Sequence, residues 1–386
     1  MAGRADILIL TSSYGGGHLQ ASRALGAGLQ AVAPDVTYAI VNFIAAVSPL
    51  ANRLAEVSYR RTVIHAPFLW WQFYRFTSRY GHPDSAWQRR LYSLLMSQML
   101  NLIALYQPGV LVGTFPTPAG VAGELKRRRR TGLPLVTVIT DQTVHSQWLH
   151  PATDLYLAGS DYVRRQLLYR GITPDRVAVT GIPIAPVFAT RRDAAATRAE
   201  LELDAGLPLV LVMTGAEGML PEAPELCRQL AFAPHPRQVA VITGRNETLR
   251  KKVEAATAAS PWPVRVLGFV DNVEAWMAAA DVLVGKAGGL TTSEALARQL
   301  PMVIIRPIPG QEEANANFLT RAGAARRAPD MTAAVGIVEQ VLDDPDLAAS
   351  MRRAAAGIAR PLAALDAAEA VLALVQGSYA FVRVAN

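Results

Sequence analysis

A glycine-rich loop that ends in a histidine is the first feature of this sequence that could do chemistry. Ser13-Tyr-Gly-Gly-Gly-His18 lies between an apolar run and a helical pattern, where a ligand can approach the backbone at the positive end of a helix. We expect that helix end to lower the pKa of His18 and keep the imidazole neutral, as a general base requires. A purely structural turn is the alternative. A dinucleotide site is disfavoured, because residue 20 is Gln and the second predicted strand ends in Asn42 instead of an acid.

A second group of glycines and polar residues lies in the second half of the chain. Residues 288–293 contain two glycines and three hydroxyl residues, whose N–H and O–H groups could bind a diphosphate. Glu294 could accept hydrogen bonds from a ribose diol, or it could simply cap the helix. Gln311 and Glu312 follow a predicted strand end, where a sugar-binding pair would stand. Each feature alone says little, but their order along the chain is specific.

Two other arrangements of ionisable residues suggest less. Asp141 and His145 have the i,i+4 spacing of a helix, at which the carboxylate could orient the imidazole. A capped helix or a buried core histidine would explain this pair equally well. The Asp-x-Asp motif at Asp344 and Asp346 lies in a turn-like sequence far from the glycine loops, so we expect no metal site there. The single cysteine, Cys227, excludes a disulfide framework.

Short β-branched runs alternate with longer helical patterns along the whole chain. The predicted strands are residues 6–11, 38–42, 110–114, 135–140, 155–159, 177–180, 209–214, 238–243, 264–268, 282–285 and 302–305. The clearest helical spacings between them are at 19–32, 50–61 and 88–106. Continuous apolar strands in such an alternation indicate parallel sheets with helices on both faces. We therefore predict an α/β protein.

A proline-containing seam near residues 181–195 divides the chain. Each half opens with an apolar strand, a glycine loop and a helix, and the second loop is Thr214-Gly-Ala-Glu-Gly218. The most economical architecture is a pair of Rossmann-like domains facing across a cleft, at residues 1–185 and 186–386. The last helix could belong to either domain, because it could also pack back on the first one.

The net charge of +7 is distributed unevenly. Residues 1–185 contain 18 Lys and Arg against 9 Asp and Glu, whereas residues 186–386 contain 20 against 22. A basic half suggests nucleic acid, an anionic membrane or a phosphorylated ligand as partner. The chain contains no run of the ~20 apolar residues needed to span a membrane, and its start lacks a signal-peptide pattern. We therefore expect a soluble or peripheral protein inside the cell.

An aromatic segment followed by a basic run stands out in the first half. Residues 68–80 contain seven of the 27 aromatic residues, and residues 126–130 are five consecutive cations. Trp, Tyr and Arg together suit a membrane interface with anionic lipids, although a core helix and a solvated helix end would also explain them. The candidates for membrane contact are Trp70, Trp71, Phe73, Tyr74, Arg75, Arg127, Arg128 and Arg129.

These motifs together resemble those of a known family. The run Gly-Gly-Leu-Thr-Thr-Ser-Glu at 288–294, with Pro-Gly-Gln-Glu-Glu-Ala-Asn-Ala-Asn-Phe at 309–318, resembles the donor half of glycosyltransferase family 28. The loop at 13–18, residues 140–148 and residues 180–184 resemble bacterial diacylglycerol glucosyltransferases and monogalactosyldiacylglycerol synthases. The resemblance covers about residues 6–330. It implies a glycosyltransferase B-type fold, a UDP-sugar donor, inversion at the anomeric carbon, and no required metal or other cofactor.

The resemblance also implies roles for individual residues. His18 matches a catalytic base, and Asp141, His145 and Trp148 match a second cluster on the acceptor side, beside the loop residues Gly15, Gly16 and Gly17. Phe269 and Val270 match the residues that hold uracil. Phosphate, ribose and sugar binding would fall to Gly215, Gly218, Gly288, Gly289, Leu290, Thr291, Glu294, Gln311 and Glu312. Glu217 departs from the family pattern. A carboxylate that faced the diphosphate would repel the diphosphate, so we expect Glu217 to contact the acceptor or to point away from the donor.

The expected function is transfer of glucose or galactose from its UDP-sugar to diacylglycerol by an inverting enzyme. The enzyme would sit peripherally on the cytoplasmic face of the cell membrane, contact anionic lipids and bind no nucleic acid. One alternative is an enzyme of the same fold with another task, namely a lipid-linked peptidoglycan precursor transferase or a UDP-sugar epimerase. The other is a noncatalytic protein that binds membranes or polyanions.

Overall fold

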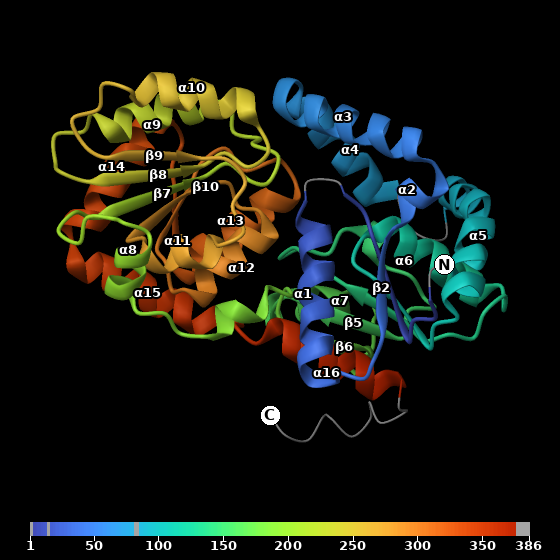
Figure 1. Ribbon diagram of the computed structural model, residues 1–386. Helices are drawn as coiled ribbons and strands as arrows, with labels where there is room; N and C mark the ends of the chain where they lie inside the picture. The colour runs from blue at the N-terminus through green and yellow to red at the C-terminus, as the bar shows by residue number, and fades with distance from the viewer. Residues whose placement is uncertain (1–2, 14–15, 81–84, 376–386) are drawn as a thin grey trace. The chain divides into compact units, whose positions relative to one another are not determined.

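The computed structural model describes residues 3–13, 16–80 and 85–375, which form two compact units (Figure 1). The first unit extends to Pro186 and resumes at Leu362, and the second is Val187–Pro361. Each unit is built on one six-stranded sheet in which all the strand pairs are parallel. The predicted α/β class is confirmed.

The sheet of the first unit has the strand order β2-β1-β3-β4-β5-β6. Its strands are β1 (Ile7–Thr11), β2 (Tyr38–Asn42), β3 (Val110–Gly113), β4 (Leu135–Val138), β5 (Leu155–Ala158) and β6 (Val177–Val179). Its α-helices are α1 (Gly17–Val32), α2 (Phe43–Val47), α3 (Pro49–His65), α4 (Pro67–Tyr80), α5 (Ala86–Tyr106), α6 (Pro116–Arg127), α7 (Asp161–Tyr169) and α16 (Ala363–Val375). Short 3-10 turns lie at Ser146–Trp148 and Pro174–Arg176.

Successive residues of β1 enter the two hydrophobic layers on opposite faces of this sheet, as the two-residue period of a strand requires. Ile7 and Ile9 pack in one layer with residues of α1 and α16, whereas Leu8 and Leu10 pack in the other with residues of α5 and α6. All four side chains are at most 1% exposed. Because both faces are covered, the strand is a continuous apolar run, which is why the sequence predicts it clearly.

Helix α16 completes the first unit by packing closely on α1. A Cβ atom placed on Gly28 would lie 2.2 Å from the backbone oxygen of Ala364, so α1 can approach α16 this closely only with glycine at that position. Ala367, Ala368 and Val371 of α16 are fully buried in the same layer.

The sheet of the second unit has the order β12-β11-β10-β7-β8-β9. Its strands are β7 (Leu209–Met213), β8 (Gln238–Ile242), β9 (Val264–Leu267), β10 (Val282–Gly285), β11 (Met302–Ile304) and β12 (Ala325–Arg327). Its α-helices are α8 (Ala194–Glu200), α9 (Ala223–Ala231), α10 (Glu247–Thr257), α11 (Val273–Ala279), α12 (Gly289–Ala297), α13 (Gln311–Ala322), α14 (Met331–Asp343) and α15 (Pro345–Ile358), and a 3-10 turn lies at Pro186–Ala189. Strand β12 is not among the predicted strands.

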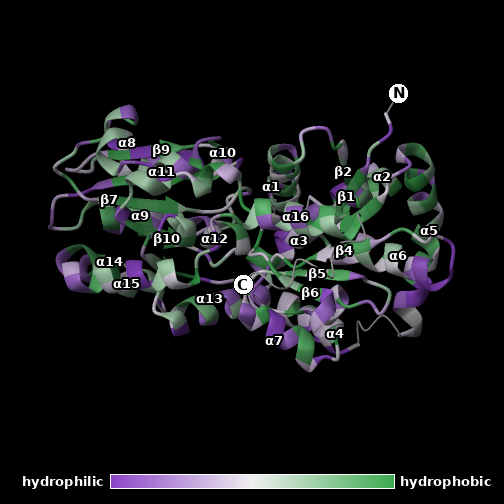
Figure 2. Ribbon diagram, turned by 90° about the horizontal axis from the view of Figure 1, so that it is seen from below, coloured by the Kyte–Doolittle hydropathy of each residue, from purple (hydrophilic) through white to green (hydrophobic). Residues whose placement is uncertain are grey.

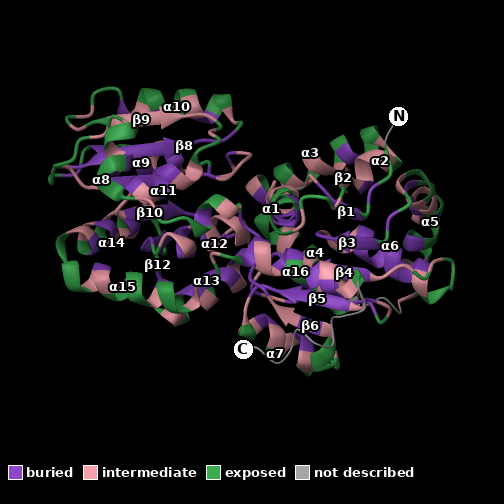
Figure 3. Ribbon diagram, turned by 60° about the horizontal axis from the view of Figure 1, so that its bottom comes forward, coloured by how far each residue is buried: buried purple, intermediate pink, exposed green. Residues whose placement is uncertain are grey.

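Burial and hydropathy follow this layering within each unit. Hydrophobic colouring concentrates on the inner strands in Figure 2, and Figure 3 shows these inner strands as buried, whereas β2 and β9 are only half-buried. Large apolar side chains that are more than half exposed occur on the neighbouring helices α3 and α4 and also on α5 and α7. They are Leu50 and Leu54 of α3, Phe68, Leu69, Phe73 and Phe76 of α4, Leu94 and Leu105 of α5, and Tyr169 of α7. Across the described residues, none of the helices is both long and apolar enough to cross a membrane.

Candidate active site

The carboxyl ends of neighbouring strands bring the polar residues of the first unit together. Asn42 ends β2 and pairs in register with Thr11, the last residue of β1, while Thr114 directly follows β3 and Thr140 follows β4. In an open parallel sheet, ligands bind at this edge. His18 joins this row as the second residue of α1.

The hydrogen bonds of His18 fix its tautomer. Its Nδ1 lies 2.9 Å from the carbonyl oxygen of Thr114, which can only accept, so Nδ1 carries the proton. Thr140 Oγ1 lies 3.0 Å from the same nitrogen. Among the described residues, no hydrogen-bond partner is found for Nε2, and this unprotonated nitrogen can accept a proton from a substrate hydroxyl.

Burial lowers the pKa of His18 to about 4, against the opposing effect of the hydrogen bond to Thr114. The imidazole is therefore neutral at pH 7, as expected, although desolvation rather than the helix end is the main cause. Phe115 packs edge-on at 5.0 Å between ring centroids, and the buried Trp148 lies at 6.0 Å. His18 and Trp148 are thus brought together.

The glycine loop supplies the turn that places His18. Gly16 has φ of 78°, a left-handed conformation that favours glycine, and Gly17 begins α1 directly after it. No side chain caps this helix start, so its N–H groups are available within the described part of the loop. Gly15 lies outside the described residues.

His145 has partners both in α4 and in the 3-10 turn that follows it. Gln147 donates its backbone N–H to Nδ1 at 3.2 Å, so Nε2 carries the proton and faces the carbonyl oxygen of Tyr74 at 3.3 Å and Thr77 Oγ1 at 3.2 Å. Burial lowers its pKa to about 4. Nε2 therefore holds α4 against the segment after β4, while Nδ1 caps the turn that follows, and both are positioning roles.

The helical spacing argued for Asp141 and His145 does not occur. Residues 141–143 form bends and residues 144–145 have no regular structure, because the chain leaves β4 and enters only a short 3-10 turn at Ser146–Trp148. The charge of Asp141 acts on Tyr74, whose pKa rises well above its usual value, mainly through burial. Asp141, Tyr74 and His145 thus lie in one neighbourhood, but not on one helix face.

The sequence does not predict a cluster of polar side chains that lies beside the glycine loop. Ser13 Oγ donates to Glu56 and accepts from Asn42 Nδ2 at 2.7 Å. Asn52 Nδ2 donates to the same carboxylate oxygen, Glu56 Oε1, at 2.8 Å. Asn52 is 8% exposed. We call Ser13, Asn42, Asn52 and Glu56 the α3 cluster. In the sequence, Asn52 and Glu56 look like ordinary polar residues of a surface helix.

In the second unit, the loop after β7 has the backbone of a tight glycine turn. Gly215 and Gly218 have φ of 84° and 61°, and a Cβ on Gly218 would lie 2.7 Å from the carbonyl oxygen of Thr243. Neither residue can therefore be replaced without strain.

Arg245 links this loop to the residue expected to hold uracil. Its guanidinium lies over the ring of Phe269 at 4.4 Å and pairs with Glu217 at 3.3 Å. The pair neutralises Glu217, the carboxylate that would repel a diphosphate. Phe269 is 42% exposed and leaves a ring surface for a base. Val270, beside it, is half-buried. Arg245 was missed, since one arginine after a strand carries no distinguishing signal.

The start of α12 has backbone N–H groups at the position where the sequence predicts a diphosphate site. Gly288 is its N-cap in an extended conformation, so the N–H groups of Gly289, Leu290 and Thr291 in the first turn have no partner from a preceding helical turn. The hydroxyls of Thr292 and Ser293, expected as further donors, instead donate to carbonyls of the same turn.

Glu294 follows these donors in α12 and has an unusual ionisation. Burial, and then the nearby carboxylate of Glu274, raise its pKa to about 7. Its charge therefore changes in the physiological range.

Gln311 and Glu312 open α13 directly after Gly310, whose φ is 103°. Glu312 is 7% exposed; one of its oxygens accepts from the N–H of Ile308 at 2.8 Å and the other lies 3.3 Å from Lys286 Nζ. A Cβ on Gly288 would lie 3.9 Å from that oxygen, so Glu312 borders the diphosphate donors. Lys286 neutralises this carboxylate, and it too was missed. Gln311 Oε1 is buried with no partner among the described residues.

The aromatic segment forms α4, and only part of it faces outward. Trp70 packs edge-on against Tyr59 at 5.0 Å, and Tyr74 lies 4.7 Å from the ring of His145. Both rings therefore pack within the unit. Phe73 is 55% exposed, and Arg75 lies over Trp71 at 4.5 Å.

The basic run at the end of α6 is partly structural. Glu124 is completely buried, and both Arg127 and Arg128 pair with it. Arg129 has φ of 56° where the helix ends. Two of the three arginines proposed for lipid contact thus neutralise a buried carboxylate, so α4 is the better place to test membrane contact.

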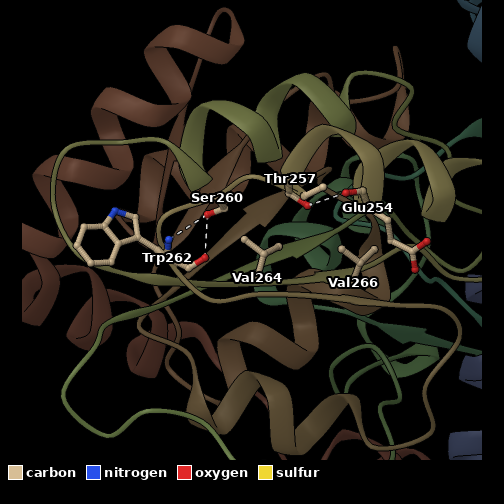
Figure 4. A pocket seen from close by; sticks show the side chains of 7 residues that line it. Glu254, Thr257, Ser260, Trp262, Val264 and Val266 are labelled. Carbon is tan, nitrogen blue, oxygen red and sulfur yellow. Dashed lines mark hydrogen bonds between the residues drawn. The ribbon is translucent and has the colours of Figure 1, made fainter.

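Three further features lie apart from these strand ends. A pocket of about 310 Å³ opens beside α10 at the amino end of β9, opposite to the end followed by Phe269 (Figure 4). His235, Glu339 and Asp343 could offer metal ligands within 4.8 Å of one another, but Glu339 already pairs with the buried Arg237. Asp344 caps α15 by accepting from the N–H groups of Asp346 and Leu347.

Comparison with known proteins decides the family. A family model of monogalactosyldiacylglycerol (MGDG) synthase matches residues 18–184, and a family model of the glycosyltransferase family 28 C-terminal domain matches residues 209–366. The processive diacylglycerol beta-glucosyltransferase of Bacillus licheniformis is 31% identical over 83% of this chain and 82% of its own length. The chain belongs to glycosyltransferase family 28. A Bacillus cereus enzyme of the same description is 28% identical to this glycosyltransferase over 95% of the chain and 93% of its own length.

Solved structures show the same fold at low sequence identity. MurG of Acinetobacter baumannii matches this glycosyltransferase with a TM-score of 0.61 at 15% identity, over 96% of this chain and 99% of that chain. The UDP-GlcNAc 2-epimerase of Neisseria meningitidis, bound to UDP-GlcNAc, matches with a TM-score of 0.59 at 12% identity, over 96% and 99%. The expected glycosyltransferase B-type fold is thereby confirmed.

Proposed function

We propose that this glycosyltransferase transfers a hexose from a UDP-sugar to the free hydroxyl of diacylglycerol, with inversion at the anomeric carbon. The observation that carries the proposal is the neutral His18 with its unprotonated Nε2, in a unit matched by the MGDG synthase family model. The names of the relatives favour glucose over galactose as the sugar.

In the proposed reaction, the acceptor oxygen attacks the anomeric carbon from the face opposite to the diphosphate. A new C–O bond forms, the bond to the diphosphate oxygen breaks, and the hydroxyl proton passes to His18 Nε2. The carbonyl of Thr114 stabilises the resulting imidazolium by accepting from Nδ1. UDP leaves with its charge bound by the N–H groups at the start of α12.

We propose that the donor is held by groups of the second unit without a metal ion. Phe269 and Val270 would contact uracil, Glu294 the ribose, and Gln311 and Glu312 the hexose. Arg245 and Lys286 support this arrangement, because each cation neutralises a carboxylate, Glu217 or Glu312, that would otherwise oppose a diphosphate.

We also propose that the enzyme is peripheral to the cytoplasmic face of the cell membrane and binds anionic lipids there. The support is the excess of cations in residues 1–185 and the six apolar side chains of α3 and α4 that are more than half exposed. Such residues suit the boundary between headgroups and acyl chains.

The deciding experiment incubates the purified protein with diacylglycerol-containing vesicles and radiolabelled UDP-glucose or UDP-galactose, with and without EDTA. Label in the organic extract as hexosyl-diacylglycerol supports the proposal and names the sugar, and nuclear magnetic resonance of the anomeric proton gives the stereochemistry. Label that stays in nucleotide sugar as an epimer would favour the epimerase alternative. Loss of transfer in EDTA would contradict metal-free donor binding.

A further inference from the structure

The first two turns of helix α3 expose two leucines and bury an asparagine, the reverse of a helix on a water-soluble surface. Leu50 and Leu54 are 68% and 62% exposed, whereas Asn52 is 8% exposed. Residues four apart share a helix face, so Leu50 and Leu54 lie on one side and Asn52 and Glu56 on nearly the opposite side. The inward side meets the strand ends beside the glycine loop.

The α3 cluster contains more hydrogen-bonding capacity than its internal contacts use. Asn52 and Ser13 both donate to Oε1 of Glu56, and among the described residues no partner of Oε2 is found. Asn42 keeps its place by accepting the N–H of Ala45 at the start of α2, which leaves the two hydrogens of its amide for Ser13 and one further acceptor. The cluster thus offers a carboxylate oxygen and an amide donor side by side.

The α3 cluster offers more hydrogen-bonding groups than the single hydroxyl of diacylglycerol can use. Diacylglycerol has a single hydroxyl group, and His18 is the group proposed to accept its proton. A hexose has several hydroxyls, each of which donates and accepts, and a carboxylate with neighbouring amides pairs with two such groups at once.

The distance from the cluster to His18 fits a hexose. The cluster lies at the ends of β2 and β1, while His18 bonds to Thr114 and Thr140 after β3 and β4. Neighbouring strands are about 4.8 Å apart, so roughly 10 Å separates β2 from β3. A hexose bound by the cluster can present another of its hydroxyls toward the base.

We propose that Asn42, Asn52 and Glu56, with Ser13, bind the hexose of an acceptor lipid that already carries one sugar, and so favour a second transfer. Glu56 accepts from one sugar hydroxyl and Asn42 donates to the next, while the apolar side of α3 faces the lipid. The residues determine specificity for the glycosylated acceptor, and the bonds made and broken are those of the first transfer. This inference rests on the proposed function and deepens it.

The test compares two acceptors, diacylglycerol and monohexosyl-diacylglycerol, each in vesicles of the same phosphatidylglycerol content. In Glu56→Ala and Asn42→Asp, we expect kcat/KM for the monohexosyl lipid to fall about tenfold further than for diacylglycerol, the equivalent of one lost hydrogen bond. Asn42→Asp keeps the oxygen that caps α2 and removes the donor amide. Ser58→Ala, an exposed position on α3, is the matched control and should leave both values unchanged.

Equal losses on the two acceptors, or no loss on either, would overturn the inference. A readout independent of transfer uses methyl β-glucoside as the probe, in saturation-transfer difference spectra of the full-length protein. Signal in the wild type and Ser58→Ala that is lost in Glu56→Ala supports sugar binding at the cluster, and signal retained in Glu56→Ala overturns it. If the wild type transfers to neither lipid, the proposed function fails, and the methyl β-glucoside spectra still decide whether the cluster binds a sugar.

Discussion

At the scale of single residues, the ionisation of His18, the proposed base, should determine how the enzyme responds to pH. A base works when it is neutral, and burial holds the pKa of this imidazole at about 4. We expect kcat/KM for the lipid acceptor, measured with saturating sugar donor, to stay level from pH 8 down to about pH 5 and to fall below that, instead of falling near 6.5 as an exposed histidine would require.

Replacement of His18 gives the complementary prediction. His18→Ala should reduce turnover by about 10²–10⁴, the usual contribution of a positioned base, while leaving UDP affinity unchanged. Turnover measured with the sugar-labelled donor, beside isothermal titration with UDP, separates the two effects. Unchanged turnover, or an acid limb that stays at pH 6.5, would assign the proton to another group.

Glu294 provides a second prediction about pH, this time for donor binding. Its pKa of about 7 means that the carboxyl is protonated below pH 7 and ionised above it. An ionised carboxylate accepts ribose hydroxyls more strongly, so UDP affinity should increase as the pH rises from 6 to 8. Glu294→Gln should remove this part of the dependence, and Glu274→Gln should move its midpoint to lower pH.

Isothermal titration with UDP in all three proteins provides the measurement. The titration of the UDP phosphate itself is common to them and cancels in the comparison. An identical pH dependence in wild type and Glu294→Gln would show that Glu294 does not contact the ribose.

Residues with a distinctive sequence context were predictable, and those defined by tertiary contacts were not. His18 stands at the end of a glycine loop, and the structure places it at the strand ends. Lys286 and Arg245 look unremarkable in the chain, because their importance comes from carboxylates that lie on other elements. The i,i+4 spacing of Asp141 and His145 led to a wrong prediction of a shared helix face, since such spacing places two side chains together only within a helix.

At the scale of elements, the contact between α1 and α16 predicts a strong effect from one methyl group. Gly28→Ala would place a Cβ 2.2 Å from the backbone oxygen of Ala364, which cannot move aside as a side chain could. We expect a loss of about 1–3 kcal/mol in the free energy of unfolding, as for other overpacked sites, measured as a lower thermal midpoint.

Gly336→Ala is the matched control, because it lies in α14, and a methyl group added there would have no described atom within 4 Å. This change should leave stability the same or raise it by up to about 1 kcal/mol through helix propensity. If Gly28→Ala behaved like Gly336→Ala, the packing of α16 on α1 would be looser than described.

Most of the strands were predictable because they are short runs rich in apolar and β-branched residues. Eleven of them end within two residues of the predicted position, including β2 and β9, which are only half-buried. Strand β12 escaped because it has only three residues, two of them exposed arginines at the edge of the sheet. Helix α3 was predicted as a helix, but which of its faces would be buried depends on the polar strand ends that it covers.

At the scale of the whole molecule, membrane association should depend on α4 more than on the basic run. Replacing Phe73 and Phe76 together by serine removes two rings that are 55% and 53% exposed. We expect affinity for phosphatidylglycerol vesicles to fall at least tenfold, because each inserted ring contributes through its apolar area. Vesicle flotation measures the effect.

Phe232→Ser is the control for this pair, since Phe232 is 45% exposed but belongs to the second unit. It should leave vesicle binding unchanged, and UDP affinity should be unaffected in all of these proteins. Vesicle binding that survives the double replacement would place the lipid contact outside α4.

The return of α16 to the first unit has a consequence for how this protein is made. The second unit is an uninterrupted stretch of chain, whereas the first lacks the helix that covers α1 until residues 363–375 have been synthesised. On the ribosome, therefore, the unit that begins the chain is completed last. Until then, the buried layer formed by Leu25, Leu29 and their neighbours stands open to water. A chaperone that protects this nascent protein would be needed most at that layer.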